Sequence, residues 1–361
     1  MTFYKQIVDM EIENSSICNA ACPACAREQT PGDYSWFTEQ YLSTEFFDRI
    51  PDSVYQGLNK ILFTGTIGDP CTAPNFIEVV NKIRAKAPNV HISANSNGGM
   101  KSTDWWRKLA KALGDNSSVT FAIDGLEDTN DIYRVNVRWK KVIENALAFI
   151  EAGGNAHWQY IVFEHNQHQV DQAQHLAKDL GFAQFTMRPS HRFKVDEFLG
   201  IEGRLGKNNV PIKPPTDEKF IHKVMLVKKE KFVQDQWFAK SNASQINCYV
   251  KEAGSVYIDY LGRILPCCFL SGGRLVRRDN KYPDGWDNIW QTYGNSKVSL
   301  HNHVWEDIIN SEFFKQIEAS WIKTYAGGRL LTCAGTCSEF QGRLNDPEEF
   351  TKEQTTVFQR S

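Results

Sequence analysis

The chain has 361 residues, of which 41% are hydrophobic, so it is long enough to bury one large core and a second, smaller one. Its formal net charge of −2 at pH 7 provides no overall basic field for nucleic acid, and no apolar run approaches the roughly 20 residues that cross a bilayer. The N-terminus lacks the basic and apolar regions of a signal peptide. The nine cysteines therefore indicate a reducing, cytoplasmic compartment and metal ligation rather than disulfides.

Strand-like and helix-like segments alternate through the first half of the chain. Apolar side chains at Phe76, Val79, Val80 and Ile83 follow the spacing of an amphipathic helix, which Pro88 ends. Strands alternating with helices imply parallel pairing with right-handed crossovers, here an open, partial (β/α)6 TIM-like barrel of the α/β class with its active site at the carboxyl ends of the strands. The predicted strands are 7–13, 60–65, 90–95, 118–124, 157–163 and 185–188, and the predicted helices are 38–50, one from 76 to Pro88, 103–113, 139–151 and 167–180.

The alternation ends near residue 190, and a different pattern follows. Residues 200–215 resemble a linker, 217–238 favour a helix, and two strand-like runs flank a turn at Leu261-Gly262 as in a hairpin. We further expect a helix over 304–321, a glycine-containing loop around Cys333 and Cys337, and a polar C-terminus that frays. The predicted divisions are a barrel at 1–195, a connection at 196–246, a small α+β domain with a hairpin at 247–345, and a tail at 346–361.

Three cysteines, Cys18, Cys22 and Cys25, directly follow the first predicted strand. Three thiolates at this spacing cannot all pair with one another, but they can converge on one metal centre. Cysteine thiolates are the usual ligands of iron–sulfur clusters, and three of them leave one iron of a four-iron cluster open. Part of a zinc site, or chance clustering, is the alternative.

The triplet resembles the signature of the radical SAM enzymes, although the residue before the third cysteine is usually aromatic in that family and is Ala24 here. The resemblance implies a 4Fe–4S cluster whose open iron binds S-adenosylmethionine. Reductive cleavage of this cofactor then gives a 5′-deoxyadenosyl radical that removes a hydrogen atom from the substrate. It also implies the same (β/α)6 partial barrel that the alternation of elements predicts.

Further motifs follow the second and third strands. Gly68-Asp69-Pro70 resembles the family's Gly-Gly-Glu-Pro motif, with Asp69 in place of glutamate, and the resemblance places the methionine amino group there. A Gly-Asp-Pro sequence is otherwise an ordinary turn. The third strand end resembles the family's Thr-Asn-Gly motif, and its candidates for the ribose hydroxyls or the carboxylate of the cofactor are Ser93, Asn95 and Asn97.

Five more residues are candidates at or after strand ends, with Arg134 in the helix expected ten residues after Asp124 and Cys71 directly after the Gly-Asp-Pro turn. The resemblance implies that Asp124 faces the substrate and that Arg134 pairs with the methionine carboxylate, whereas a turn carboxylate and a solvated arginine are the alternatives. Asn166, after the fifth strand, is a further candidate cofactor contact. Arg188 is a candidate substrate anchor, and Cys71 is either a packed thiol or a catalytic hydrogen donor.

The C-terminal cysteines form a second group. Cys248, thirteen residues, Gly262, four residues and Cys267 resemble the opening of the SPASM pattern, and Cys333 and Cys337 offer two more ligands. Four cysteines suffice for one auxiliary 4Fe–4S cluster, as in the shortened "twitch" variant, and Cys268 can replace Cys267. A structural zinc site with four cysteines is the alternative.

Together these motifs predict a radical SAM oxidoreductase that carries out a net oxidation, either a dehydrogenation or a crosslink. An electron donor such as flavodoxin or ferredoxin is an implied partner. Only seventeen residues precede Cys18, so no peptide-binding domain is expected there; this favours a small-molecule substrate over a ribosomal peptide. A non-catalytic binding protein stapled by metal is the competing hypothesis, and the low net charge disfavours a nucleic-acid-modifying radical enzyme.

Overall fold

The computed structural model describes residues 3–25, 27, 38–189, 206–221, 242–271, 285–338 and 354–358. Most of the helix predicted at 217–238 lies outside these residues, as do parts of the predicted linker and tail. No helix in the described part of the chain is long and apolar enough to cross a membrane.

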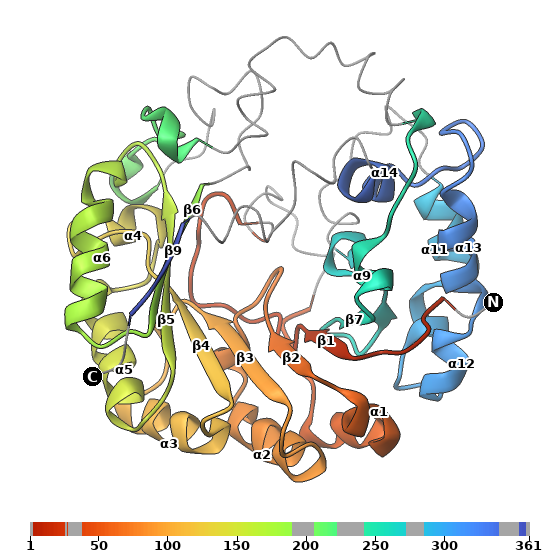
Figure 1. The fold of residues 1–361 in the computed structure, drawn as a ribbon, viewed down its shortest axis with the longest axis horizontal. Coiled ribbons are helices and arrows are strands. Elements are labelled where there is room, and N and C mark those ends of the chain that lie inside the picture. The colour runs from red at the N-terminus through yellow and green to blue at the C-terminus, as the bar shows by residue number, and fades with distance from the viewer. Residues whose placement is uncertain are drawn as a thin grey trace.

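Six parallel strands form the core of the structure, in the same order in the sheet as in the sequence (Figure 1). Each strand pairs with the next one along the chain, as a series of right-handed crossovers requires. The predicted partial barrel is therefore confirmed. The strands are β1 (Asp9–Ile12), β2 (Lys60–Phe63), β3 (His91–Ser96), β4 (Ser117–Ala122), β5 (Ala156–Val162) and β6 (Gln184–Pro189).

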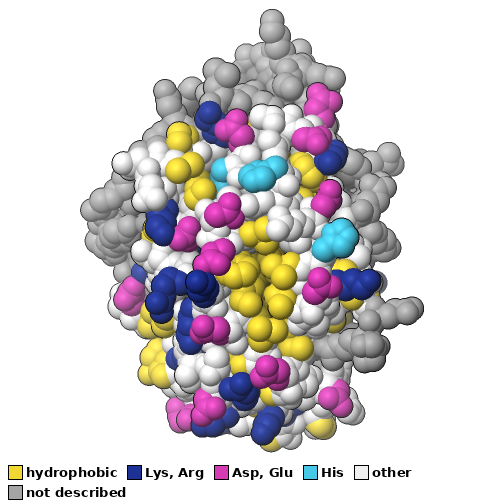
Figure 2. All heavy atoms as spheres, turned by 90° about the vertical axis from the view of Figure 1, so that its left-hand side faces the viewer, with side chains coloured by type: hydrophobic (Ala, Val, Ile, Leu, Met, Phe, Trp, Pro, Cys, Tyr) yellow, Lys and Arg dark blue, Asp and Glu magenta, His cyan; other side chains and the backbone are white. Residues whose placement is uncertain are grey.

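Helices cover the outer face of this curved sheet (Figure 1). Two of them, α3 (Thr103–Leu113) and α5 (Trp139–Glu151), begin and end at the predicted residues. The predicted apolar face of α2 (Phe76–Lys86) is buried. Figure 2 views the side on which α6 lies, where Lys and Arg side chains stand between Asp and Glu side chains around a hydrophobic area. The remaining helices of the barrel part are α1 (Asp52–Gly57), α4 (Asn130–Tyr133) and α6 (Val170–Asp179).

The two faces of the sheet differ in polarity. Phe121 packs against Trp106 and Phe149, at ring distances of 5.0 and 5.9 Å, so its face of β4 points toward the helices. Side chains alternate along a strand, and the pairing register carries this assignment across the sheet. The opposite, concave face is polar, and its members include Glu11, Ser93, Asn95, Thr120, Gln159 and Thr186.

The predicted hairpin is present, and it extends the barrel sheet. Strands β7 (Ser255–Ile258) and β8 (Ile264–Leu265) pair antiparallel around Gly262, whose φ of 71° favours glycine. Strand β7 also pairs parallel with β1, so the two halves of the chain share one sheet. The helices that surround the hairpin are α9 (Tyr249–Glu252), α11 (Trp286–Tyr293), α12 (Trp305–Ile309), α13 (Glu312–Ser320) and α14 (Leu331–Cys337).

Four local predictions are wrong. Residues 38–50 contain only a short 3-10 helix, Thr44–Arg49, because Ser43 caps it and Pro51 separates it from α1. The helix predicted over 304–321 is divided between α12 and α13. Cys333 and Cys337 lie on α14 rather than in a loop. In the predicted tail, Thr355–Val357 forms β9, which pairs antiparallel with β6 and therefore does not fray.

Candidate functional site

The first group of cysteines lies in the loop after β1, with Cys22 buried and Cys18 and Cys25 partly buried. The Cys25 amide donates to the Cys22 carbonyl at 2.8 Å, which forms a tight turn. Two polar side chains reach the sulfurs: Asn97, directly after β3, has its Nδ2 3.7 Å from Cys18 Sγ, and Arg134, at the C-terminal end of α4, has its Nη1 3.8 Å from Cys22 Sγ. The fold thus places donors beside the thiols that the sequence proposed as metal ligands.

Burial favours the protonated form of two of these thiols. Burial raises the pKa of Cys18 to about 12 and that of Cys22 to about 11, and the Arg134 charge partly opposes the shift at Cys22. Only a thiolate binds a metal, so loading this loop releases protons, and the positive charge of the bound group compensates for the burial. Three soft sulfur donors on one loop suit an iron–sulfur cluster.

The Gly68-Asp69-Pro70 turn packs directly on the cysteine loop. A Cβ atom on Gly68 would collide with the Ser15 carbonyl oxygen, and one on Gly65 would collide with the carbonyl of Gly68. The Asp69 amide donates to the Ile17 carbonyl at 2.8 Å. Glycine is required here because two backbone segments lie in contact, so the turn and the cysteine loop are positioned together.

The Asp69 carboxylate is engaged within the protein. Its Oδ1 accepts from the Cys71 amide at 3.0 Å, and its Oδ2 accepts from Ser96 Oγ at 3.0 Å and the Asn97 amide at 2.7 Å. Burial raises the pKa of Asp69, and these donors counteract the rise. Asp69 therefore joins the ends of β2 and β3 and orients Asn97 toward Cys18.

Asp124 and Arg134 form a buried ion pair, with Arg134 Nε 2.6 Å from Asp124 Oδ2. The other carboxylate oxygen accepts from the Ile161 amide at 2.6 Å. Burial raises the pKa of Asp124, whereas the guanidinium lowers it. Because Arg134 also contacts Cys22, this pair links the end of β4 to the cysteine loop.

Some of the other predicted residues are hydrogen-bonded within the fold, and others have polar groups without a protein partner. Asn166 donates to the Asp124 and Ile161 carbonyls at 2.8 and 2.9 Å and accepts from the Phe163 amide, so both of its amide hydrogens are used in the fold. Ser93 Oγ, in contrast, is buried and has no hydrogen-bond partner in the described structure. Asn95 shares its concave face and is partly exposed. Ser93 and Asn95 are thus available to a polar ligand.

Cys71 and Arg188 occupy opposite environments. Cys71 is fully buried in a 3-10 turn, and burial raises its thiol pKa well above the usual value. Arg188 is exposed near the end of β6. A packed thiol is therefore the role that the surroundings of Cys71 favour, whereas the Arg188 side chain is accessible to a substrate.

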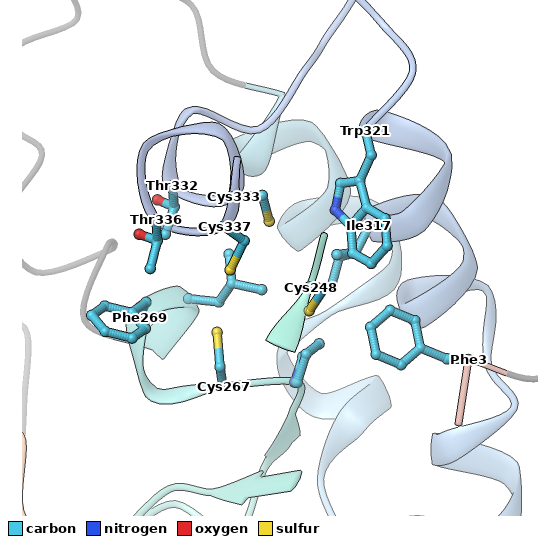
Figure 3. Close-up of a pocket in the computed structure, with 12 residues that line it drawn as sticks. Phe3, Cys248, Cys267, Phe269, Ile317, Trp321, Thr332, Cys333, Thr336 and Cys337 are labelled. Atoms are coloured by element: carbon cyan, nitrogen blue, oxygen red, sulfur yellow. The ribbon is translucent and has the colours of Figure 1, made fainter. Parts of the chain in front are cut away.

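The four C-terminal cysteines converge on a second pocket, shown in Figure 3. Cys248, Cys267, Cys333 and Cys337 all line it, and the thiol of Cys337 hydrogen-bonds to Cys248, which lowers the pKa of Cys248. Cys268 is not among the lining residues; its thiol contacts the partly buried carboxylate of Glu11 instead. Of the two adjacent cysteines, Cys267 is the one that points to the other three.

The pocket is otherwise mainly hydrophobic, and its donors are chemically suited to a metal centre. Among the described residues, no three His, Cys, Asp or Glu side chains meet the spacing of a single-ion site. By donor type, four thiols can complete the ligation of a 4Fe–4S cluster; zinc takes the same donors, but the spacing here is not that of a single-ion site. The walls around the sulfurs are formed by Phe3, Pro266, Phe269, Leu270, Ile317, Trp321, Thr332 and Thr336.

Two contributions were missed in the sequence. Phe3 lines the pocket of Cys248, Cys267, Cys333 and Cys337, which we call the auxiliary pocket. These cysteines are hundreds of residues away from Phe3 in the chain, so the local sequence does not reveal the contact. Glu13 is fully buried beside the Gly68 turn and is hydrogen-bonded to Tyr257 of β7. A signal for Glu13 was present, because Asp9, Glu11 and Glu13 are acidic residues at alternating positions that point to one face of a strand.

Comparisons with known proteins concern the family and the fold. Residues 12–177 match the family model described as the Radical SAM superfamily. SuiB of Streptococcus suis bound to S-adenosylmethionine is similar in structure, with a TM-score of 0.52, 12% identity, and coverage of 91% of this chain and 77% of SuiB. The structure of native anSMEcpe with bound AdoMet also gives a TM-score of 0.52, at 14% identity, with coverage of 95% of this chain and 92% of that one. No curated protein sequence matches the chain.

Proposed function

We propose that the chain cleaves S-adenosylmethionine reductively and uses the resulting radical to oxidise a bound substrate, on the basis of the match of residues 12–177 to the Radical SAM superfamily model. The observation that supports this proposal is the presence of two separate groups of cysteines. One triplet lies beside the polar strand ends, and four further thiols line a different pocket. A purely structural role for metal would not require the open ligand set or the polar concave face.

In this proposal, Cys18, Cys22 and Cys25 hold a 4Fe–4S cluster with one open iron. When bound, this group supplies the electron that cleaves the cofactor into methionine and a 5′-deoxyadenosyl radical. The Gly68 turn and Asn97 shape the methionine end of the site. The ion pair with Asp124 holds the Arg134 guanidinium beside Cys22. Ser93 and Asn95 face the concave side with polar groups that a ribose or carboxylate can use.

The pocket lined by four cysteines supports the proposal of a net oxidation. The substrate first loses a hydrogen atom to the 5′-deoxyadenosyl radical, which becomes 5′-deoxyadenosine. Cys248, Cys267, Cys333 and Cys337 would hold a second 4Fe–4S cluster, which would supply an acceptor for the electron that the substrate radical loses together with a proton. The net result is a two-electron oxidation, as in a dehydrogenation or a crosslink. An external donor such as flavodoxin or ferredoxin supplies the electron for cofactor cleavage.

A peptide is the substrate class that the comparisons favour. SuiB has been solved with its precursor peptide SuiA, at a TM-score of 0.52 to this chain, and anSMEcpe with the Kp18Cys peptide, at 0.51. The sequence alone favours a small molecule, and that remains the second candidate. The exposed Arg188 is the proposed anchor in either case, because its guanidinium can bind a carboxylate of either type of substrate.

The test is anaerobic formation of 5′-deoxyadenosine after reconstitution with iron and sulfide, in the presence of dithionite and S-adenosylmethionine. The wild type and Cys268→Ala should form it, whereas the triple variant Cys18→Ala, Cys22→Ala, Cys25→Ala should not. The triple variant should keep about four iron atoms, bound by the auxiliary cysteines. If the wild type neither forms 5′-deoxyadenosine nor binds S-adenosylmethionine, the chain is instead a non-catalytic binding protein whose fold is stabilised by metal.

A further inference from the structure

Glu13 is a fully buried carboxylate that lies directly after β1 and five residues before Cys18. Its Oε1 accepts from the Ile67 amide at 2.7 Å and from the Gly68 amide at 3.4 Å. Its Oε2 accepts from the Tyr257 hydroxyl at 2.7 Å. These donors come from two segments that are far from Glu13, and from each other, in the sequence.

Both segments lead to the candidate sites. Ile67 and Gly68 belong to the turn that packs on the cysteine loop, and Gly68 is the glycine whose backbone touches Ser15. Tyr257 lies on β7, between Cys248 and Cys267 in the chain. Glu13 therefore joins the cofactor turn to β7, the strand that lies between Cys248 and Cys267 in the chain.

We propose that Glu13 is a positioning residue that holds the Ile67–Gly68 turn in the conformation that receives the methionine end of the cofactor, and that cofactor binding weakens when Glu13 loses its charge. This inference rests on the proposed function, since it concerns the same cofactor. The backbone amides of Ile67 and Gly68 have Glu13 as their anchor, so a weaker anchor frees the turn.

The surroundings of Glu13 shift its pKa in opposite directions. Burial raises its pKa to about 7; the amide and Tyr257 donors oppose the rise, and the nearby Asp259 adds to it. Asp259 is itself paired with Arg263, at 2.5 Å, so that cation is not directed to Glu13. A hydrogen bond to a carboxylate is roughly twice as strong as one to a neutral group. As pH falls through 7, Glu13 becomes protonated and its bond to the Ile67 amide weakens.

The cofactor's own titration must be separated from that of Glu13. The amino group of S-adenosylmethionine is an α-amino group, whose pKa is about 8. Deprotonation of this ligand raises affinity with pH in any variant. Glu13→Gln keeps the shape and an acceptor oxygen for Ile67, but it cannot ionise. The ratio of the two dissociation constants, variant to wild type, thus isolates the charge of Glu13.

The experiment measures S-adenosylmethionine binding to the anaerobically reconstituted, unreduced protein by equilibrium dialysis at pH 6, 7 and 8. We expect the ratio of the Glu13→Gln to the wild-type dissociation constant to be near one at pH 6 and about ten at pH 8. Tyr257→Phe removes a donor to the charged form, so the pKa of Glu13 rises and the decline in affinity begins at a higher pH than in the wild type.

Each outcome decides a different claim. If the wild type binds and the ratio stays constant from pH 6 to pH 8, the role assigned to Glu13 is wrong and the proposed function stands. If the wild type does not bind S-adenosylmethionine at any pH, the proposed function fails and this inference fails with it. Should Glu13→Gln not fold, the pH profile of Tyr257→Phe decides: an unchanged profile overturns the inference.

Discussion

Cys267 and Cys268 are adjacent in the chain, yet their side chains lie in different surroundings. Cys267 lines the pocket with three other cysteines, whereas Cys268 contacts Glu11 on the concave face of β1. The spacing pattern of the sequence admits either residue as a ligand. The choice depends on how the chain turns after β8, and the sequence does not show on which side of that turn each thiol lies.

A matched pair of serine variants tests this assignment. We expect Cys267→Ser to lose about half of the iron after reconstitution, because one auxiliary ligand is missing, and Cys268→Ser to keep it all. Iron and sulfide analysis, with Mössbauer spectroscopy for the cluster type, makes the comparison. Equal iron loss in the two variants, or zinc in place of iron, would show that the pocket is not the proposed cluster site.

At the same scale, residue positions were easier to predict than residue roles. Asp69, Asp124 and Asn166 were expected at strand ends, and they are there. Their side chains, however, accept from or donate to backbone groups brought in from other strands. A sequence shows that a polar group follows a strand, but not whether a neighbouring backbone group uses it. Glu13 was missed for the same reason, because its partners are 54 and 244 residues away.

Helices were predicted correctly where neighbouring residues in the sequence determine their ends. α3 and α5 were predicted to the residue, because periodic apolar side chains and terminal glycines are readable from nearby sequence. α14 was missed because threonine and glycine disfavour a helix, and contacts with the pocket outweigh that preference. β9 consists of three residues, and its partner β6 is about 170 residues away, so no local signal predicts its pairing.

The turn after β2 gives a test at the scale of an element. In Gly68→Ala the added methyl group would meet the backbone of Ser15 and Ser16, neither of which can move aside without shifting the cysteine loop. We expect a loss of about 1–3 kcal/mol in the free energy of unfolding, together with weakened S-adenosylmethionine binding. Urea denaturation and equilibrium dialysis measure the two effects.

Gly57→Ala is the matched control, since a Cβ there makes only ordinary contacts at 3.7 Å or more. Gly57 ends α1, so alanine should change stability by less than about 1 kcal/mol and leave cofactor binding unchanged. If Gly68→Ala behaved like Gly57→Ala in both measurements, the close approach between the turn and the cysteine loop would have no consequence for the site.

In the whole molecule, the barrel strands β1–β6 share one continuous sheet with β7 and β8. We call β7, β8 and the helices α9 to α14 the auxiliary part. β1 lies between β2 and β7, so an isolated barrel would expose one edge of its first strand. The N-terminal residues strengthen the connection, because Phe3 packs edge-on against Phe314 and Trp321, at 5.3 and 5.9 Å. The sequence indicated two domains from the change in pattern near residue 190, but it does not reveal that they share a sheet.

One cooperative unfolding transition is therefore expected for the metal-free chain, with circular dichroism and tryptophan fluorescence coincident in urea. Phe3→Ala removes a buried aromatic ring that belongs to the N-terminal segment but packs on the auxiliary part, at a cost of about 3–5 kcal/mol. Because the parts unfold together, both probes should shift to lower urea by the same amount.

Ile322→Ala, at a side chain that is 93% exposed, is the control and should change stability by less than about 0.5 kcal/mol. Two separate transitions, with only one of them moved by Phe3→Ala, would mean that the shared sheet does not couple the barrel to the auxiliary part. The bridge through Glu13 would then join two units that open independently.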